Sequence, residues 1–188
     1  GRNEIYGEKY IEKGLADMVK FTIKFCMQNK MKLVFAWKRD KKTSPEAHMR
    51  ELNFLKKYLS DDEINYLYIN SVSRKNKSYT SYMSMAQSRV VVGFWSTMLR
   101  EHLATGGKIL SCNLIRTNIF NFPIGGICSI KNCTYKEFEK RLLDIYMMPQ
   151  KKYFSKLGRD KCYMIKYDKD NSTIDILKRK IDLFLAKT

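Results

Sequence analysis

Hydrophobic positions along the chain alternate between helical and strand-like spacing, and this alternation predicts a series of helices and strands. From Tyr10 to Gln28 apolar residues recur every three or four positions, as on one face of a long amphipathic helix. Short apolar runs typical of buried strands occupy residues 32–37, 66–70, 89–94 and 108–113, with a weaker one at 126–130. Helical spacing is found at 79–87, 97–104, 135–147 and 173–185, and after Pro45 and Pro149.

Several helix boundaries are marked by particular residues. Pro45 is well placed in the first turn of a helix whose apolar positions include Met49 and Leu52. The pair at 106–107 is Gly-Gly, which predicts the end of the preceding helix. Thr134 and Glu137 have the spacing of a capping box, so a helix is expected to begin at Tyr135.

Strands that alternate with helices predict an α/β fold. Because each predicted strand is short and apolar, the sheet is expected to be mainly parallel, with helices on both faces. No internal repeat or linker interrupts residues 1–188, so we expect a single Rossmann-like, doubly wound domain. In such sheets ligands bind outside the carboxyl ends of the strands, which directs the search for function to the turns after each strand.

Composition supports an ordinary globular domain. The 188 residues are 44% hydrophobic and 29% charged, which excludes a disordered or low-complexity chain. No apolar run approaches the ~20 residues that cross a bilayer, so no transmembrane segment is predicted. The chain starts Gly1-Arg2, which suggests a piece excised from a longer protein. Five cysteines without a C-x-x-C pair predict reduced, mostly buried thiols and no zinc site, in a cytoplasmic protein.

The chain carries a formal net charge of +17. Such an excess favours a polyanionic partner: a nucleic acid, an anionic membrane surface or a phosphorylated small molecule. The abundance of Lys, Asn, Ile and Tyr is equally well explained by background residue usage, and the two interpretations stay open at this point.

The most informative turn follows the predicted strand at 89–94. The strand ends at Gly93, and Ser96 and Thr97 then open a helix, where free backbone N–H groups and hydroxyls would favour a phosphate. Glu101 lies about one and a half turns further, from where its carboxylate could reach a sugar hydroxyl. The alternative is that Ser96 is an ordinary N-cap and that Glu101 is a solvated residue paired with a neighbouring cation, Arg100 or Lys108.

Two basic, polar loops are expected at the same edge of the sheet. Lys38 and Arg39 follow the predicted strand at 32–37 and could bind phosphate. Ser73, Ser78 and Tyr79 follow the predicted strand at 66–70. Basic loops are common on a cationic protein, so either loop alone is weak evidence for a phosphate site. Their predicted position at the same edge of the sheet is stronger evidence.

Other chemistries receive less support. The chain lacks the G-x-x-x-x-G-K-[ST] and G-x-G-x-x-G motifs of P-loop NTPases and dinucleotide-binding enzymes. His48 and His102, the only histidines, are expected to be structural residues rather than catalytic ones. Most Phe residues occupy periodic core positions, so nucleic-acid stacking is not indicated.

Residues 88–113, SRVVVGFWSTMLREHLATGGKILSCN, resemble the nucleotide-sugar-binding half of GT-B glycosyltransferases of surface-polysaccharide synthesis. The resemblance implies that Ser96 and Thr97 hold the donor diphosphate, that Glu101 binds the ribose, and that Lys38 and Arg39 neutralise the departing phosphate. The donor would be a nucleotide-diphosphate or nucleotide-monophosphate sugar, with no cofactor and no metal. No residue of the chain is identified as the catalytic base.

The resemblance also implies partners. A complete GT-B enzyme has two Rossmann-like domains, so an amino-terminal domain of the same parent chain and a glycan acceptor are expected, and the isolated domain would be inactive without them. The location would be the cytoplasm, in solution or at the membrane surface. The rival hypotheses are a non-enzymatic module that binds nucleic acid or an anionic surface, and a sugar-nucleotide epimerase.

Overall fold

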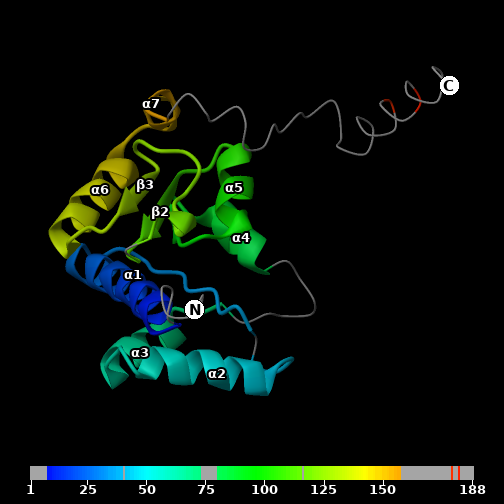
Figure 1. The fold of residues 1–188 in the computed structure, drawn as a ribbon, viewed down its shortest axis with the longest axis vertical. Coiled ribbons are helices and arrows are strands. Elements are labelled where there is room, and N and C mark those ends of the chain that lie inside the picture. Colours follow the sequence, from blue (N-terminus) through cyan, green and yellow to red (C-terminus); the bar gives the residue numbers. More distant parts are fainter. Residues whose placement is uncertain are drawn as a thin grey trace.

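The computed structural model describes residues 8–39, 41–72, 80–115 and 117–157, together with Arg179 and Asp182. This part of the chain is α/β, with a three-stranded parallel sheet in the order β1-β2-β3 (Figure 1). The elements are α1 (Glu8–Gln28), α2 (Pro45–Lys56), α3 (Asp61–Ile69), α4 (Thr80–Gln87), β1 (Val91–Gly93), α5 (Thr97–Ala104), β2 (Ile109–Asn113), the 3-10 helix η1 (Asn118–Phe120), β3 (Ser129–Lys131), α6 (Tyr135–Met147) and α7 (Gln150–Ser155).

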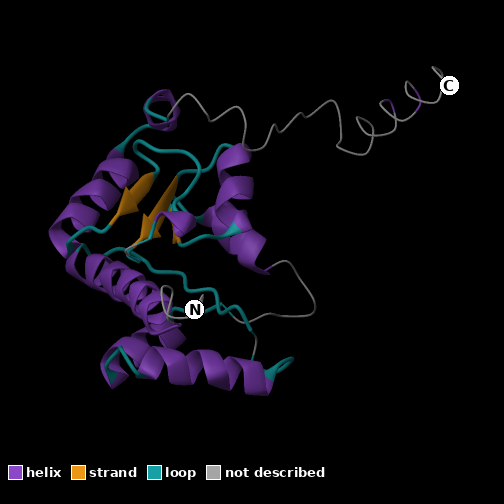
Figure 2. Cartoon of the chain, in the orientation of Figure 1, coloured by secondary structure: helices purple, strands orange, loops and turns teal. Residues whose placement is uncertain are grey.

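The sheet lies between two groups of helices. Figure 2 shows the strands with α6 on one side and with α4 and α5 on the other. β2 is the central strand, and all five of its residues are buried. This burial on both faces fits the apolar Ile109, Leu110 and Cys112, which come from both faces of the strand. The two polar residues of β2, Ser111 and Asn113, are buried as well. The predictions of a parallel sheet and of helices on both sides are therefore confirmed for the described residues.

Helix α1 lies between the sheet and the pair α2–α3 (Figure 1). Its Phe21 packs edge-on against Tyr135 and also contacts Phe138, both on α6, with ring centroids 5.5 and 5.6 Å apart. Gly14 of α1 allows close approach to Ile115, which follows β2, because a Cβ at position 14 would lie only 2.6 Å from the Ile115 side chain. These contacts place α1 beside the carboxyl end of β2.

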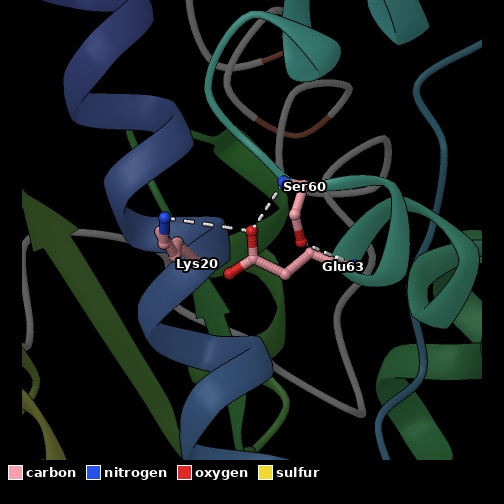
Figure 3. Close-up of polar contacts among 3 residues, drawn as sticks. All are labelled: Lys20, Ser60 and Glu63. Carbon is pink, nitrogen blue, oxygen red and sulfur yellow. Dashed lines mark hydrogen bonds and ion pairs between the residues drawn. The ribbon is translucent and has the colours of Figure 1, made fainter.

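Helix α3 is joined to α1 at its first turn. The Ser60 hydroxyl accepts the Glu63 N–H at 3.2 Å, and the Glu63 carboxylate accepts the Ser60 N–H at 2.9 Å, which completes a capping box. The same carboxylate lies 3.9 Å from Nζ of Lys20 on α1 (Figure 3). One side chain thus both starts α3 and links it to the neighbouring helix.

Two predicted strands are absent from the sheet. Residues 66–70 were expected to form a strand but belong mostly to α3, whose buried residues Ile64 and Leu67 have helical spacing. Residues 32–37 are extended but make only one parallel bridge, Phe35 with Ser71, so they form no strand of the sheet. Met49 of α2, counted with the apolar face of its helix, is 45% exposed.

Other predictions agree closely with the structure. Helices α5 and α6 have the expected bounds, and β1, β2 and β3 lie within or beside the predicted strands. The capping box at α6 is present, and the hydrogen bond from the Thr134 N–H lowers the pKa of Glu137 below its usual value. The helix predicted at 173–185 lies outside the described ranges, except for the single residues Arg179 and Asp182.

The amino edge of the sheet is fastened by α6 and α7. The buried Tyr153 hydroxyl donates to the Ile109 carbonyl at 2.8 Å and accepts the Ile109 N–H at 3.1 Å. Nζ of Lys108 donates to the carbonyls of Ile145 and Met148 at 2.6 and 2.8 Å, at the end of α6. A cation is favourable there because the last carbonyls of a helix have no partner within the helix and carry partial negative charge.

Candidate functional site

Three small residues are aligned across the sheet: the last of β1, the middle one of β2 and the first of β3. Gly93 of β1 pairs in register with Ser111 of β2, and Ser111 pairs with Ser129 of β3. Register partners lie on the same face of a sheet, so these residues share one face. A Cβ at Gly93 would lie 3.2 Å from the side chain of Leu99, so this glycine lets α5 approach the sheet closely.

A cavity of about 310 Å³ opens on this face beside the two serines. We call it the carboxyl-edge cavity. Its polar lining comes from four side chains and from the backbone of two glycines. The side chains are those of Ser111, Asn113, Ser129 and Lys131, and the glycines are Gly125 and Gly126. Phe122 and Ile130 are among the other lining residues. Hydroxyls, carboxamides and one ammonium group suit a ligand rich in hydroxyl groups or negative charge.

The loop over the cavity is held by Asn113. Its Nδ2 donates to the Thr117 carbonyl at 2.9 Å and to Oδ1 of Asn121 at 2.7 Å, and its Oδ1 accepts the Ile115 N–H at 3.0 Å. These bonds use the carboxamide to shape the loop after β2. The cavity is therefore preorganised by a buried side chain that is 3% exposed.

The turn after β1 forms the other side of the same edge. Ser96 is the N-cap of α5, and its hydroxyl accepts the Met98 N–H at 3.3 Å. Trp95 has a φ of 41° and is 60% exposed. Its ring packs edge-on against Phe120, at 4.8 Å between centroids, which joins the turn after β1 to the loop after β2. A large side chain rarely adopts a positive φ outside turns or functional sites.

Glu101 lies four residues after Thr97 on α5, so the two share a helix face that begins at the carboxyl edge. Lys108, one of the two cations considered as its partner, is instead buried against the end of α6. That part of the structural alternative for Glu101 is wrong. The N-cap role of Ser96 is confirmed and leaves its hydroxyl proton available to a ligand.

The first basic loop does not follow a strand of the sheet. The backbone N–H groups of Lys38 and Arg39 point to the Glu51 carboxylate, at 3.3 and 3.2 Å, and the Arg39 carbonyl accepts a hydrogen bond from Nδ1 of His48 at 3.0 Å. The loop is therefore fastened to α2, which α1 separates from the sheet (Figure 1). The expectation that it lies at the sheet edge is wrong, because residues 32–37 pair only once; phosphate binding by Lys38 and Arg39 stays a prediction.

Ser73, Ser78 and Tyr79 of the second loop lie outside the described residues. The cavity-lining residues that the sequence analysis did not single out include Ser111, Ser129 and Lys131, together with Gly125 and Gly126. One signal was available: Ser111 and Asn113 are polar residues in a strand whose other residues are apolar.

A second cavity, of about 340 Å³, lies beside α6 and includes Cys133, Glu137 and Arg141 in its lining. The Cys133 thiol hydrogen-bonds with the buried Cys112, and this contact lowers the pKa of Cys133 and raises that of Cys112. Arg141 donates to the Gly126 and Ser129 carbonyls at 2.9 and 3.0 Å. These bonds hold the segment that leads into β3 in place. The role of Arg141 at this cavity is structural.

The expected burial of Cys26, Cys112 and Cys128 is confirmed. Burial raises the pKa of Cys26 and of Cys128 to about 11, so both thiols are protonated at neutral pH. Within the described ranges no group of three or more His, Cys, Asp or Glu side chains could hold a metal ion. Among the same residues no helix is long and apolar enough to cross a bilayer.

The chain matches a known protein family. Residues 1–181 match a family model described as "putative O-antigen biosynthesis protein". The match covers nearly the whole chain, so the protein belongs to this family, and its description indicates polysaccharide biosynthesis. No curated protein and no solved structure matches the chain.

Proposed function

We propose that the protein binds a nucleotide-sugar donor at the carboxyl edge of its sheet and serves glycosyl transfer in O-antigen synthesis. The carboxyl-edge cavity carries this proposal, because its hydroxyls and its ammonium group lie where parallel α/β sheets bind ligands. Membership of an O-antigen biosynthesis family supports a glycan-related substrate. On this proposal the three strands are the centre of a Rossmann-like donor domain, one half of a GT-B enzyme.

The proposed donor spans the edge from β1 to β3. Its phosphates lie between the first turn of α5, at Ser96 and Thr97, and Nζ of Lys131. Glu101 accepts hydrogen bonds from the ribose hydroxyls of the nucleotide. Ser111 and Ser129 contact the sugar that is to be transferred. The positive end of the helix dipole and the lysine then offset the charge of the leaving group.

In the proposed transfer, an acceptor hydroxyl forms a bond to the anomeric carbon of the donor sugar. The bond from that carbon to the phosphate oxygen breaks, and its electron pair leaves with the nucleotide. The hydroxyl proton passes to a base outside this set of residues. We propose that an amino-terminal domain of the parent chain supplies this base and the glycan acceptor site.

Nucleotide binding tests the proposal. We expect one of UDP, GDP, CDP or CMP to raise the free energy of unfolding by about 2.7 kcal/mol at 100 times its dissociation constant. Lys131→Met should weaken that binding, whereas Lys151→Met, at an exposed lysine on α7, should leave it unchanged. Absence of stabilisation by all four nucleotides, or an equal loss in both variants, would contradict the proposed site.

A further inference from the structure

The layer formed by α2, α3 and the extended segments beside them exposes five large apolar side chains. Ile69 is 73% exposed and Met49 is 45% exposed. Tyr68, Val34 and Val72 are 36–37% exposed. We call these five residues the α2–α3 patch. Single exposed apolar residues are common on protein surfaces. Several exposed apolar residues on elements that touch each other indicate a surface that binds a partner protein or a membrane.

Direct contacts join the elements that carry the patch. His48, next to Met49 on α2, lies with Nε2 3.2 Å from the Tyr68 hydroxyl of α3. The Val72 N–H donates to the carbonyl of Phe35, the neighbour of Val34, at 3.1 Å. Phe35 and Ser71 form a parallel bridge, so the extended segments lie side by side.

Packing beneath the patch fixes its outer side. Along residues 33–37, Leu33 and Trp37 are buried, whereas Val34 and Ala36 between them are exposed. The Trp37 ring packs against His48 and Tyr68, with centroids 4.7 and 5.2 Å apart. Leu33 and Trp37 therefore point into the core, whereas Val34 and Ala36 point outward. Tyr68 belongs to both sides, because its ring packs against Trp37 and is still 37% exposed.

The cations of this layer lie on α2 and on the segment before it, whereas α3 begins with the acidic residues Asp61, Asp62 and Glu63. Six exposed basic residues lie between positions 31 and 51, against two acidic ones among the described residues of that range. One of the two, Glu51, is engaged by the backbone N–H groups of Lys38 and Arg39. The cations are Lys32, Lys38, Arg39, Lys41, Lys42 and Arg50.

We propose that the α2–α3 patch and these cations dock the protein on an anionic lipid bilayer. Aliphatic side chains such as Ile69 and Met49 can enter the headgroup boundary, while the surrounding cations attract acidic headgroups. Single-stranded nucleic acid would instead be recognised by exposed aromatic rings in a basic groove, and the most exposed residues here are aliphatic. The docking surface lies away from the sheet and does not depend on the proposed donor site (Figure 1).

Vesicle sedimentation tests the charged component. We expect the protein to sediment with vesicles of phosphatidylcholine and phosphatidylglycerol at 0.05 M salt, and to bind vesicles of phosphatidylcholine alone much less. Each Lys or Arg near an anionic surface contributes about 1 kcal/mol, so Lys41→Glu with Arg50→Glu should weaken binding by roughly 25-fold or more. The matched control is Lys151→Glu with Lys152→Glu, on α7 at the opposite end of the molecule, which should bind like the wild type (Figure 1).

The apolar component has its own pair of variants. Ile69→Ser should weaken binding to the anionic vesicles several-fold, whereas Met147→Ser, at a 64% exposed residue of α6, should not. Circular dichroism checks that each variant is folded. The proposal is overturned if the wild type does not bind anionic vesicles, if it binds only a DNA oligonucleotide, or if the control variants lose as much binding as the patch variants. None of these outcomes depends on nucleotide binding.

Discussion

The packing of Gly107 against His102 allows a stability prediction that can be worked from the structure. A Cβ at position 107 would overlap three atoms of the His102 imidazole, Nε2, Cδ2 and Cε1. His102 is only 8% exposed, in the last turn of α5, so its ring cannot simply turn into solvent. Gly107→Ala therefore forces the ring or the helix to move, and overpacking of this kind costs about 1–3 kcal/mol.

The assay is urea unfolding of the wild type, Gly107→Ala, His102→Ala and the double variant. Once the ring is absent, the added methyl group has space, so the cost of Ala at position 107 should fall below about 0.5 kcal/mol. Gly125→Ala is the matched control, because nothing lies within 4 Å of its Cβ position. The reasoning is refuted if the two single glycine variants unfold alike, or if the costs at positions 107 and 102 simply add.

Four further predictions concern ionisable residues. Lys108→Met removes the donor to the last carbonyls of α6 and should lower the free energy of unfolding by at least about 1.5–3 kcal/mol in urea titrations, against no change for Lys151→Met. Burial lowers the pKa of His102 below its usual 6.5, so the unfolded chain binds more protons than the folded one below that pH. Stability should then be lost as pH falls from about 6.5 toward the folded pKa, by at most about 1.4 kcal/mol per pH unit, and His102→Leu should remove this component. Glu101→Gln should weaken binding of the nucleotide by about 1.5–3 kcal/mol in calorimetric titrations, yet leave its 2′,3′-dideoxy analogue unaffected. If the first basic loop also contacts phosphate, as the resemblance implies, Lys38→Ala with Arg39→Ala should weaken binding of a nucleoside diphosphate but not of the bare nucleoside. A donor held only at the carboxyl-edge cavity predicts no change, and equal loss for both ligands would show that these cations do not contact phosphate.

Local signals in the sequence predicted the second half of the described fold well. Ser96 and Thr134 are N-caps with side-chain hydrogen bonds to their own helices, so the signal and its physical effect lie within a few residues. The Gly-Gly pair predicted the end of α5, and Gly106 has the positive φ of 91° that such a position requires. Helices whose boundaries depend on such short-range interactions can be predicted from the sequence before the fold is known.

The errors arose where propensity and capping disagreed. Tyr66, Tyr68 and Ile69 favour a strand by side-chain type, but the capping box of Ser60 and Glu63 begins a helix that includes them. Ser60 and Glu63 have the same spacing as the capping box predicted at Thr134 and Glu137. The signal for a helix was therefore present in the sequence, but the apolar run was given more weight. Residues 32–37 form an apolar run typical of a buried strand, but with no second strand at 66–70 they pair only once, through Phe35 with Ser71.

The sequence singled out the turn after β1 as part of the candidate site, whereas it did not single out the cavity lining that comes from β2 and β3. The cavity depends on register: Ser111 meets Ser129 only because the strands pair at those positions, and no local pattern specifies an offset of this kind. The shape of the loop above it depends on a carboxamide network centred on Asn113. Both features follow from tertiary structure, which explains why Lys131 was not considered as a phosphate ligand.

The net charge of +17 combines cations in three different physical settings. Lys108 is buried and its ammonium group donates to the last carbonyls of α6, so it is not accessible for direct contact with a partner. Lys131 lines the carboxyl-edge cavity, where a single positive charge favours a phosphate group without requiring a large basic surface. The cations of residues 32–50 are exposed around apolar side chains, and only such a cluster gives the strong salt dependence expected of a protein attracted to a polyanion. Net charge alone therefore does not distinguish a small phosphorylated ligand from an anionic surface. The two kinds of partner would contact different cations of the same chain.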